Sequence, residues 1–289
     1  MRLPTVGLLG VGRMGLPIAK RLLAAGYPVL AFDPAPDRLH EAVRSGVVAG
    51  ADASAVAGSA DILVTVLPGS TEVGEVLPGV LSALREGGLW LDLTSSDPEL
   101  VTRLSAGIGA VGAPMGGGPV AAQAGTLLFY VGGAREDVER ALPVLESLGT
   151  VERVGDDVGA GYTAKLLANL LWFGQAVAVT EALLLGQSLG VPPARLRGTL
   201  ARSAGGSVFI DEYLDHLLDG DYLESFGVDR CVEELNILVR LADARGVPFE
   251  VSAAVTAQYR DALARFGAVG GELLASKLLE ERAGRVIRR

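Results

Sequence analysis

The chain has 289 residues, of which 49% are hydrophobic and 20% are charged, and its formal net charge is −9. This composition predicts a globular protein long enough for two domains and a large core, and it excludes a disordered chain. The negative charge argues against nucleic acid as a partner. A single cysteine, Cys231, excludes an internal disulfide and a cysteine-based zinc site. The two histidines, His40 and His216, stand in unrelated settings, so we predict no metal site.

The amino-terminal residues enter a strand directly and have no signal-peptide layout. No apolar run reaches membrane-spanning length without a charge or a glycine. We therefore predict a cytoplasmic protein that does not contact a membrane.

A glycine-rich turn lies between the first predicted strand, residues 5–10, and a helix over residues 16–25. Its GxGxxG spacing in this strand–turn–helix context is the dinucleotide fingerprint. We expect its glycines to allow the tight turn, the approach of a pyrophosphate and the close packing of the helix. The alternative is an ordinary βαβ unit that binds no dinucleotide. The predicted cofactor-binding residues here are Gly10, Val11, Gly12, Arg13, Met14 and Gly15.

Asp33 ends the next predicted strand, residues 28–32. An acidic residue about twenty positions after the fingerprint can accept hydrogen bonds from ribose hydroxyls. It would also repel a 2′-phosphate, so the sequence favours NAD over NADP.

Two more strands, over residues 61–67 and 88–93, alternate with helices, as in a parallel sheet. Ligands of open α/β sheets bind beyond the carboxyl ends of the strands. Leu67, Pro68 and Ser95 stand at such ends, so we predict that they face the same crevice as the glycine-rich turn.

Asp97 and Pro98 predict the N-cap and first position of a helix. Farther along, Gly116, Gly117 and Gly118 offer exposed backbone N–H groups that could hold a substrate carboxylate. The alternative is a flexible connection between strands. Residues 126–131 and 151–154 predict further strands, with a helix over 135–148 between them.

A long helix is predicted from Gly159 to about Gly190, where Lys165 and Glu181 are the only charged residues. At 1.5 Å per residue it would span roughly 40 Å. An apolar helix of this length is typical of burial between domains or subunits, so we expect at least a dimer. Asn169 follows Lys165 by four residues and so shares its helix face.

Lys165 is one of three lysines, against twenty-two arginines. Lysine differs from arginine because burial can lower its pKa into the range of a general acid or base. The other interpretation is a lysine whose stem lies along apolar surface while its ammonium reaches water.

From Val191 onward the pattern is helical. The sequence therefore predicts an α/β Rossmann-type domain over residues 1–158 and an all-α domain over residues 159–289, joined by the long interdomain helix.

Several motifs occur together and in order: the fingerprint with Met14, Leu67-Pro68, Asp92-x-Thr94-Ser95-x-x-Pro98, Ala113-Pro114-x-x-Gly117-Gly118, and Gly159-x-Gly161-x-x-x-Lys165-x-x-x-Asn169. On these motifs the chain resembles the β-hydroxyacid dehydrogenase family, which includes 3-hydroxyisobutyrate dehydrogenase and relatives of 6-phosphogluconate dehydrogenase. The resemblance implies an NAD(P)-dependent oxidoreductase that acts on a small hydroxy acid. It also implies that Lys165 is the acid/base and that Asn169 orients the substrate.

Two positions depart from the family pattern. Gly116 stands where the family usually has a serine that helps to hold the substrate carboxylate, and Glu233 stands where it has a lysine. Arg230 could restore positive charge there, or it could pair with Glu233 or Glu234. We take Ser95, the glycine triplet, Arg230 and Glu233 as substrate-binding candidates.

Two other functions stay open from the sequence. The acidic pair at residues 233–234 suits a cationic substrate, as in imine reductases of similar architecture, although those enzymes generally lack the lysine. The altered substrate positions also suit a cofactor-binding homologue without catalysis. In each case we expect a homodimer or homotetramer.

Overall fold

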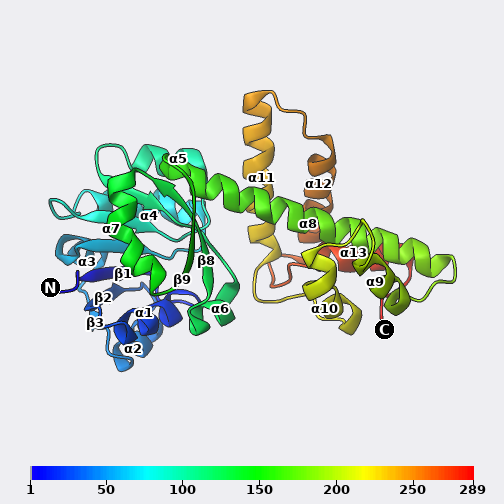
Figure 1. Ribbon diagram of the computed structural model, residues 1–289, viewed down its shortest axis with the longest axis horizontal. Coiled ribbons are helices and arrows are strands. Elements are labelled where there is room, and N and C mark those ends of the chain that lie inside the picture. Colours follow the sequence, from blue (N-terminus) through cyan, green and yellow to red (C-terminus); the bar gives the residue numbers. More distant parts are fainter. Residues whose placement is uncertain (1) are drawn as a thin grey trace. The chain divides into compact units, whose positions relative to one another are not determined.

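The computed structural model describes residues 2–289. The chain divides into two compact units, Met1–Lys165 and Leu166–Arg289 (Figure 1). The division falls inside the long helix, and the predicted domain boundary after residue 158 stays a prediction.

The first unit is built on one sheet with the strand order β3-β2-β1-β4-β5-β6-β8-β7, and β9 pairs with β8. Strands β1 to β6 run parallel, whereas β8 runs antiparallel to both β6 and β7. The strands are β1 (Val6–Leu9), β2 (Val29–Phe32), β3 (Val48–Ala49), β4 (Ile62–Thr65), β5 (Leu89–Asp92), β6 (Gly109–Gly112), β7 (Met115–Gly116), β8 (Leu127–Gly133) and β9 (Gly149–Gly155).

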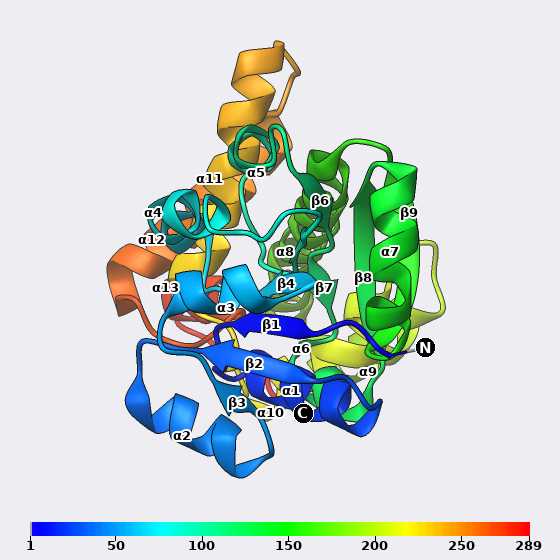
Figure 2. The ribbon, with the colours of Figure 1, turned by 90° about the vertical axis from the view of Figure 1, so that its left-hand side faces the viewer.

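Helices cover both faces of this sheet (Figure 2). One apolar cluster joins α1, α2, α6 and α7 to one set of strand side chains, and a second joins α3, α4 and α5 to the alternate set. This alternation follows from the two-residue period of a strand. The helices are α1 (Gly15–Ala24), α2 (Pro36–Arg44), α3 (Ala53–Ser59), α4 (Ser70–Leu81), α5 (Pro98–Leu104), α6 (Gly118–Ala124) and α7 (Arg135–Glu146).

The carboxyl ends of the parallel strands stand in one row. Leu9 is in register with both Phe32 and Thr65, Thr65 with Asp92, and Asp92 with Gly112. Five connections therefore leave the sheet from the same edge, and every predicted cofactor residue lies on one of them.

The second unit is helical. Its elements are the greater part of α8 (Val158–Ser188), then α9 (Pro193–Ala201), a π-helical segment η1 (Phe209–Tyr213), α10 (Leu214–Asp219), α11 (Val228–Arg245), α12 (Glu250–Phe266) and α13 (Leu274–Ala283). Cys231, on α11, is fully buried in the core of the second unit. That burial raises the pKa of the thiol well above its ordinary value.

Helix α8 is long and apolar enough to cross a membrane by length and composition, a test that core helices of soluble proteins also pass. Leu166, Leu170, Phe173 and Val177 on α8 pack into the same cluster as α11, α12 and α13. This packing assigns α8 to the core of the second unit.

Most predicted elements are confirmed within a few residues, including the long helix and the Asp97 cap. The Asp97 side chain accepts a hydrogen bond from the Glu99 amide at 2.9 Å, and Pro98 opens α5. The expectation of a parallel sheet holds for β1 to β6 and for the β8–β9 pair, but β8 runs antiparallel to β6 and β7. The connection from β7 to β8, residues 117–126, is shorter than the dozen or more residues that a parallel crossover needs, and β8 runs antiparallel to β7.

Candidate active site

The glycine-rich turn has the geometry that its sequence predicts. Gly10 has φ +90°, and a Cβ built there would collide with the Val66 carbonyl. A Cβ at Gly15 would collide with the Gly10 carbonyl. At Gly12 the nearest group within 4 Å of such a Cβ is the Arg38 guanidinium, at 3.7 Å. The backbone beside Gly12 is therefore open enough for a pyrophosphate, so these residues fit a dinucleotide.

Asp33 is buried at the end of β2 and shapes the same turn. Its Oδ2 accepts from the Val11 amide and its Oδ1 from the Ala35 amide, each at 2.9 Å. Each carboxylate oxygen has a further lone pair, so both can still accept from a ribose hydroxyl. Arg38, exposed on α2, adds a cation beside the turn that the sequence did not single out.

The connections after β4 and β5 are tied to each other. The Thr94 hydroxyl accepts from the Leu67 amide at 3.0 Å, and the Ser70 hydroxyl accepts from the Asp97 amide at 3.0 Å. Ser95, half-buried, lies between these two ties. The structure thus holds Leu67 and Ser95 on neighbouring connections at one edge of the sheet.

The glycine triplet runs from the end of β7 into the start of α6 in the same unit. Gly117 and Gly118 have φ of +107° and +67°, a left-handed backbone that favours glycine. Gly116 differs, because the atoms nearest to a Cβ built there are 3.8 Å away. A small side chain would therefore fit at Gly116 without displacing its neighbours.

Asp92 is the centre of a buried hydrogen-bond network in the row of strand ends. Its Oδ1 accepts from the Thr65 hydroxyl at 2.5 Å and from the Thr94 amide at 3.1 Å, and its Oδ2 accepts from the Tyr162 hydroxyl at 2.6 Å. Burial raises the pKa of the Asp92 carboxyl, although these hydrogen bonds oppose the rise. Burial, followed by the Asp92 charge, raises the pKa of Tyr162 well above its ordinary value.

Lys165 is half-buried on α8, one turn after Tyr162. The start of that helix rests directly on the sheet, since a Cβ at Gly161 would collide with the Tyr130 carbonyl. The ring of Tyr162 occupies the place of a Cβ at Gly112. The glycine-rich entry to the helix thus permits the close approach of another backbone that the sequence predicts.

Asn169 belongs to the second unit and is oriented by a buried acid. Its Nδ2 donates to Glu234 Oε2 at 2.6 Å, and Glu234 is 5% exposed. A carboxylate only accepts, so this bond fixes which end of the Asn169 amide faces Glu234.

Arg230 and Glu233, both on α11, form an ion pair. Arg230 Nη1 lies 2.8 Å from Glu233 Oε2, and Arg230 Nε lies 3.7 Å from Asp229 Oδ2. Of the two interpretations of Arg230, pairing with Glu233 is therefore the one that the structure shows.

The sequence analysis did not single out Tyr162 or Arg38, and it considered Glu234 only as a partner of Arg230 and as part of an acidic pair. Glu234 carried a usable signal, because it falls on the apolar face of α11 with Cys231 and Leu238. An acid at such a position needs a partner. Tyr162 gave no comparable signal, since its partner Asp92 lies 70 residues away.

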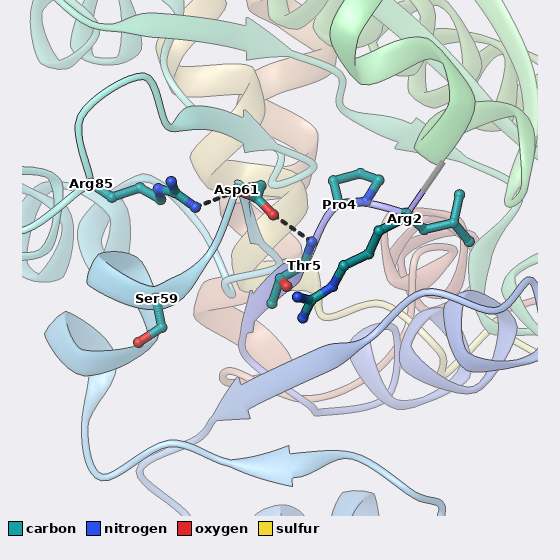
Figure 3. A pocket seen from close by; sticks show the side chains of 7 residues that line it. Arg2, Pro4, Thr5, Ser59, Asp61 and Arg85 are labelled. Carbon is teal, nitrogen blue, oxygen red and sulfur yellow. Dashed lines mark hydrogen bonds and ion pairs between the residues drawn. The ribbon is translucent and has the colours of Figure 1, made fainter.

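A polar cavity of about 560 Å³ lies elsewhere, at the amino ends of β1 and β4 (Figure 3). There the Asp61 carboxylate accepts from the Thr5 amide at 2.8 Å and pairs with Arg85. Ligands of open α/β sheets bind at the opposite ends of the strands, so we do not assign this cavity to the active site.

Comparison with known families agrees with this geometry. The family model described as the NAD binding domain of 6-phosphogluconate dehydrogenase matches residues 5–159. The model described as NAD-binding of NADP-dependent 3-hydroxyisobutyrate dehydrogenase matches residues 159–277. The chain belongs to the β-hydroxyacid dehydrogenase family.

Individual relatives support the same assignment. The chain is 32% identical over 261 residues to 2-(hydroxymethyl)glutarate dehydrogenase of Eubacterium barkeri, covering 87% of this chain and 86% of that protein. The solved 3-hydroxyisobutyrate dehydrogenase of Mycobacterium tuberculosis, titled with L-serine, matches with a TM-score of 0.87 and 26% identity, covering 96% of this chain and 99% of that one.

The imine reductase of Streptomyces aurantiacus matches with a TM-score of 0.63 at 20% identity, a likeness that shows the fold alone. This β-hydroxyacid dehydrogenase is thus a nicotinamide-dependent oxidoreductase that acts on CH–OH groups.

Proposed function

We propose that this β-hydroxyacid dehydrogenase reversibly oxidises the alcohol of a small hydroxy acid, or of a related hydroxy compound, with Lys165 as the acid/base. One observation carries the proposal. Tyr162, one turn before Lys165, is bonded to Asp92 in the row of strand ends where the dinucleotide turn and the Ser95 connection begin. The lysine therefore stands on a turn fastened to the edge that bears the cofactor and substrate residues.

In the oxidation direction, the neutral amine of Lys165 takes the proton of the substrate hydroxyl. In reduction, its ammonium returns that proton to the forming alkoxide. The bound nicotinamide supplies hydride transfer at its C4. A positioned proton donor of this kind contributes roughly 10²- to 10⁴-fold to the rate.

Substrate orientation is assigned to Asn169 in this proposal. Glu234 accepts from the Asn169 amino group, so the amide oxygen of Asn169 is the atom that would accept from the substrate hydroxyl or the lysine. Ser95 and the amides of residues 116–118 hold the other end of the substrate. The Arg230–Glu233 pair offers further hydrogen-bonding groups to the substrate.

NAD is the proposed cofactor. The buried Asp33 carboxylate at the end of β2 favours ribose hydroxyls and disfavours a 2′-phosphate. Arg38 acts in the opposite sense, as a cation that could pair with a phosphate. The ratio of kcat/KM for the two cofactors measures which residue dominates, and a preference for NADP would overturn the role given to Asp33.

We also propose a homodimer or homotetramer, and we keep the cytoplasm as its predicted compartment. Support for the oligomer comes from an exposed apolar stripe on α8. Leu171 and Leu185 on this helix are 65% and 62% exposed, and Leu189, one residue beyond its end, is 74% exposed. Exposed apolar patches commonly mark sites of interaction between proteins.

The proposal is tested by assaying hydroxy acids, led by 3-hydroxyisobutyrate and 2-(hydroxymethyl)glutarate, with NAD and NADP, on wild type and Lys165→Met. Methionine keeps the length of the side chain and removes the exchangeable proton. We expect kcat to fall by about 10²- to 10⁴-fold, while the dissociation constant for NADH, followed by cofactor fluorescence, stays unchanged.

The matched control is Lys20→Met, the same substitution at an exposed lysine on α1. It should leave kcat and NADH binding as in wild type. Turnover by Lys165→Met at more than about a tenth of the wild-type rate would remove Lys165 as the acid/base, because tenfold is below the range for such a group.

A further inference from the structure

The buried carboxylate of Asp92 is bonded both to the strand-end connections that carry predicted cofactor residues and to the helix that carries Lys165. Asp92 is 1% exposed, and its two oxygens face different elements. Oδ1 accepts from Thr65 on β4 and from the Thr94 amide, while Oδ2 accepts from Tyr162 on α8. One oxygen of Asp92 thus holds the strand-end connections, here called the cofactor side, and the other holds the start of α8, here called the lysine side.

On the cofactor side, the network reaches the connections that carry predicted site residues. Thr94 precedes Ser95 and accepts from the Leu67 amide at 3.0 Å. The Trp90 indole donates to the Thr65 hydroxyl at 3.0 Å, which holds that hydroxyl toward Asp92. A movement of Asp92 would therefore move both connections.

On the lysine side, the network fixes the first turns of α8. Tyr162 is 1% exposed, and its ring lies against Gly112 in the row of strand ends. Tyr162 stands three residues before Lys165, so the two side chains leave neighbouring turns on adjacent parts of one helix face. The Tyr162–Asp92 bond therefore limits the rotation and the height of the turn that bears Lys165.

Packing alone does not require this polar pair. Phenylalanine would fill the same space among the apolar residues of the cluster, which includes Leu63, Trp90 and Val101. Burying a carboxylate and a hydroxyl costs desolvation free energy. Buried polar pairs of this kind can fix one unique arrangement of the elements that carry them. Burial raises the pKa of Tyr162 well above its ordinary value, so its hydroxyl keeps the proton that it donates.

We propose that Tyr162 and Asp92 are positioning residues that set the place of Lys165 relative to Ser95 and the dinucleotide turn. The inference rests on the proposed role of Lys165 as the acid/base. In this proposal the Tyr162 hydroxyl affects kcat only by positioning Lys165, and it contacts neither substrate nor cofactor.

The test compares Tyr162→Phe with Tyr259→Phe. Both tyrosines are fully buried, and each donates one hydrogen bond, in the control to the Glu272 carbonyl at 2.9 Å in the second unit. For Tyr162→Phe we expect kcat to fall about 10- to 100-fold with KM for the cofactor unchanged. The primary isotope effect with deuterated NADH should rise, because the chemical step becomes slower. Tyr259→Phe should keep the wild-type kcat and isotope effect.

A second variant separates positioning from stability. Tyr162→Phe leaves the Asp92 charge with one donor fewer, whereas the double variant Tyr162→Phe/Asp92→Asn removes the charge as well. We expect the double variant to regain thermal stability but not kcat. Recovery of kcat together with stability would mean that the loss was structural, and the proposal would fail.

The two proposals fail in different ways. If Tyr162→Phe behaves like Tyr259→Phe while Lys165→Met is inactive, the positioning role is wrong and the proposed function stands. If Lys165→Met keeps its turnover, the proposed function is wrong, and the positioning role fails with it.

Discussion

Gly116 departs from the family pattern at a position that has room for a serine side chain. A Cβ at this position has no heavy atom closer than 3.8 Å, and the backbone there is not left-handed. We predict that Gly116→Ser lowers KM for hydroxy acids about tenfold, since a hydrogen bond to a charged group contributes about 1.5 kcal/mol. Steady-state kinetics on a hydroxy acid and on its neutral amide checks this. An equal gain on the amide would show that the serine does not contact the carboxylate.

The pH dependence of stability should carry a contribution from Asp92. Burial raises the pKa of the Asp92 carboxyl in the folded state above the ordinary value of 3.8, which applies to the unfolded chain. Between the unfolded and the folded pKa, the folded state therefore binds more protons than the unfolded chain. The contribution to the free energy of unfolding is complete below 3.8 and is lost as pH rises through the folded value.

Asp92→Asn removes this titration and leaves the others in place. We therefore predict that the free energy of unfolding of wild type, minus that of Asp92→Asn, decreases as pH rises from about 4 to about 8. Urea unfolding of both proteins across this range measures the difference. A difference that increases with pH would mean that the pKa of Asp92 is lowered in the folded state.

At the scale of elements, the contact of α8 with the sheet depends on the absence of a side chain at Gly161. An added Cβ would meet the Tyr130 and Gly112 carbonyls, which are backbone atoms and cannot rotate away. We predict that Gly161→Ala lowers the free energy of unfolding by about 1–3 kcal/mol.

The matched control is Gly79→Ala in α4, where nothing lies within 4 Å of an added Cβ. This change should raise stability by about 0.5–1 kcal/mol, because alanine favours a helix more than glycine does. Thermal unfolding compares the two variants. Equal effects of the same sign would contradict the close contact at Gly161.

Local sequence signals were sufficient for most elements and insufficient for side-chain pairs. The fingerprint turn, the Asp97 cap and the long helix each depend on residues a few positions apart, so the sequence predicted them. The antiparallel course of β8 depends on how the chain returns after α6, and no local pattern encodes that.

Within the site, the sequence predicted the strand-end residues because parallel strands place their carboxyl ends together. It missed the Asn169–Glu234 bond, whose partners are 65 residues apart. It left the role of Arg230 open, since pairing and substrate contact are both possible three residues before an acid. Such choices are settled by tertiary packing.

At the scale of the whole molecule, the proposed oligomer places the exposed leucines of α8 in its interface. Leu171 and Leu185 are mostly exposed, so charging them should leave the fold of one chain intact. We predict that Leu171→Glu/Leu185→Glu converts the oligomer to a monomer of 29.8 kDa. Light scattering after size exclusion measures the mass. Val76→Glu, at a 41% exposed position on α4 of the first unit, is the control and should not change it. An oligomer that survives the double substitution would assign the interface to another surface.

The burial of Cys231 has a practical consequence. Because it is the one cysteine of the chain and is fully enclosed in the helical unit, a thiol reagent such as Ellman's reagent reacts only when that unit opens. Its labelling rate therefore times the opening of the helices without any engineered reporter. Because the native thiol is enclosed, a cysteine introduced at the surface can be labelled selectively with a fluorophore in the folded protein.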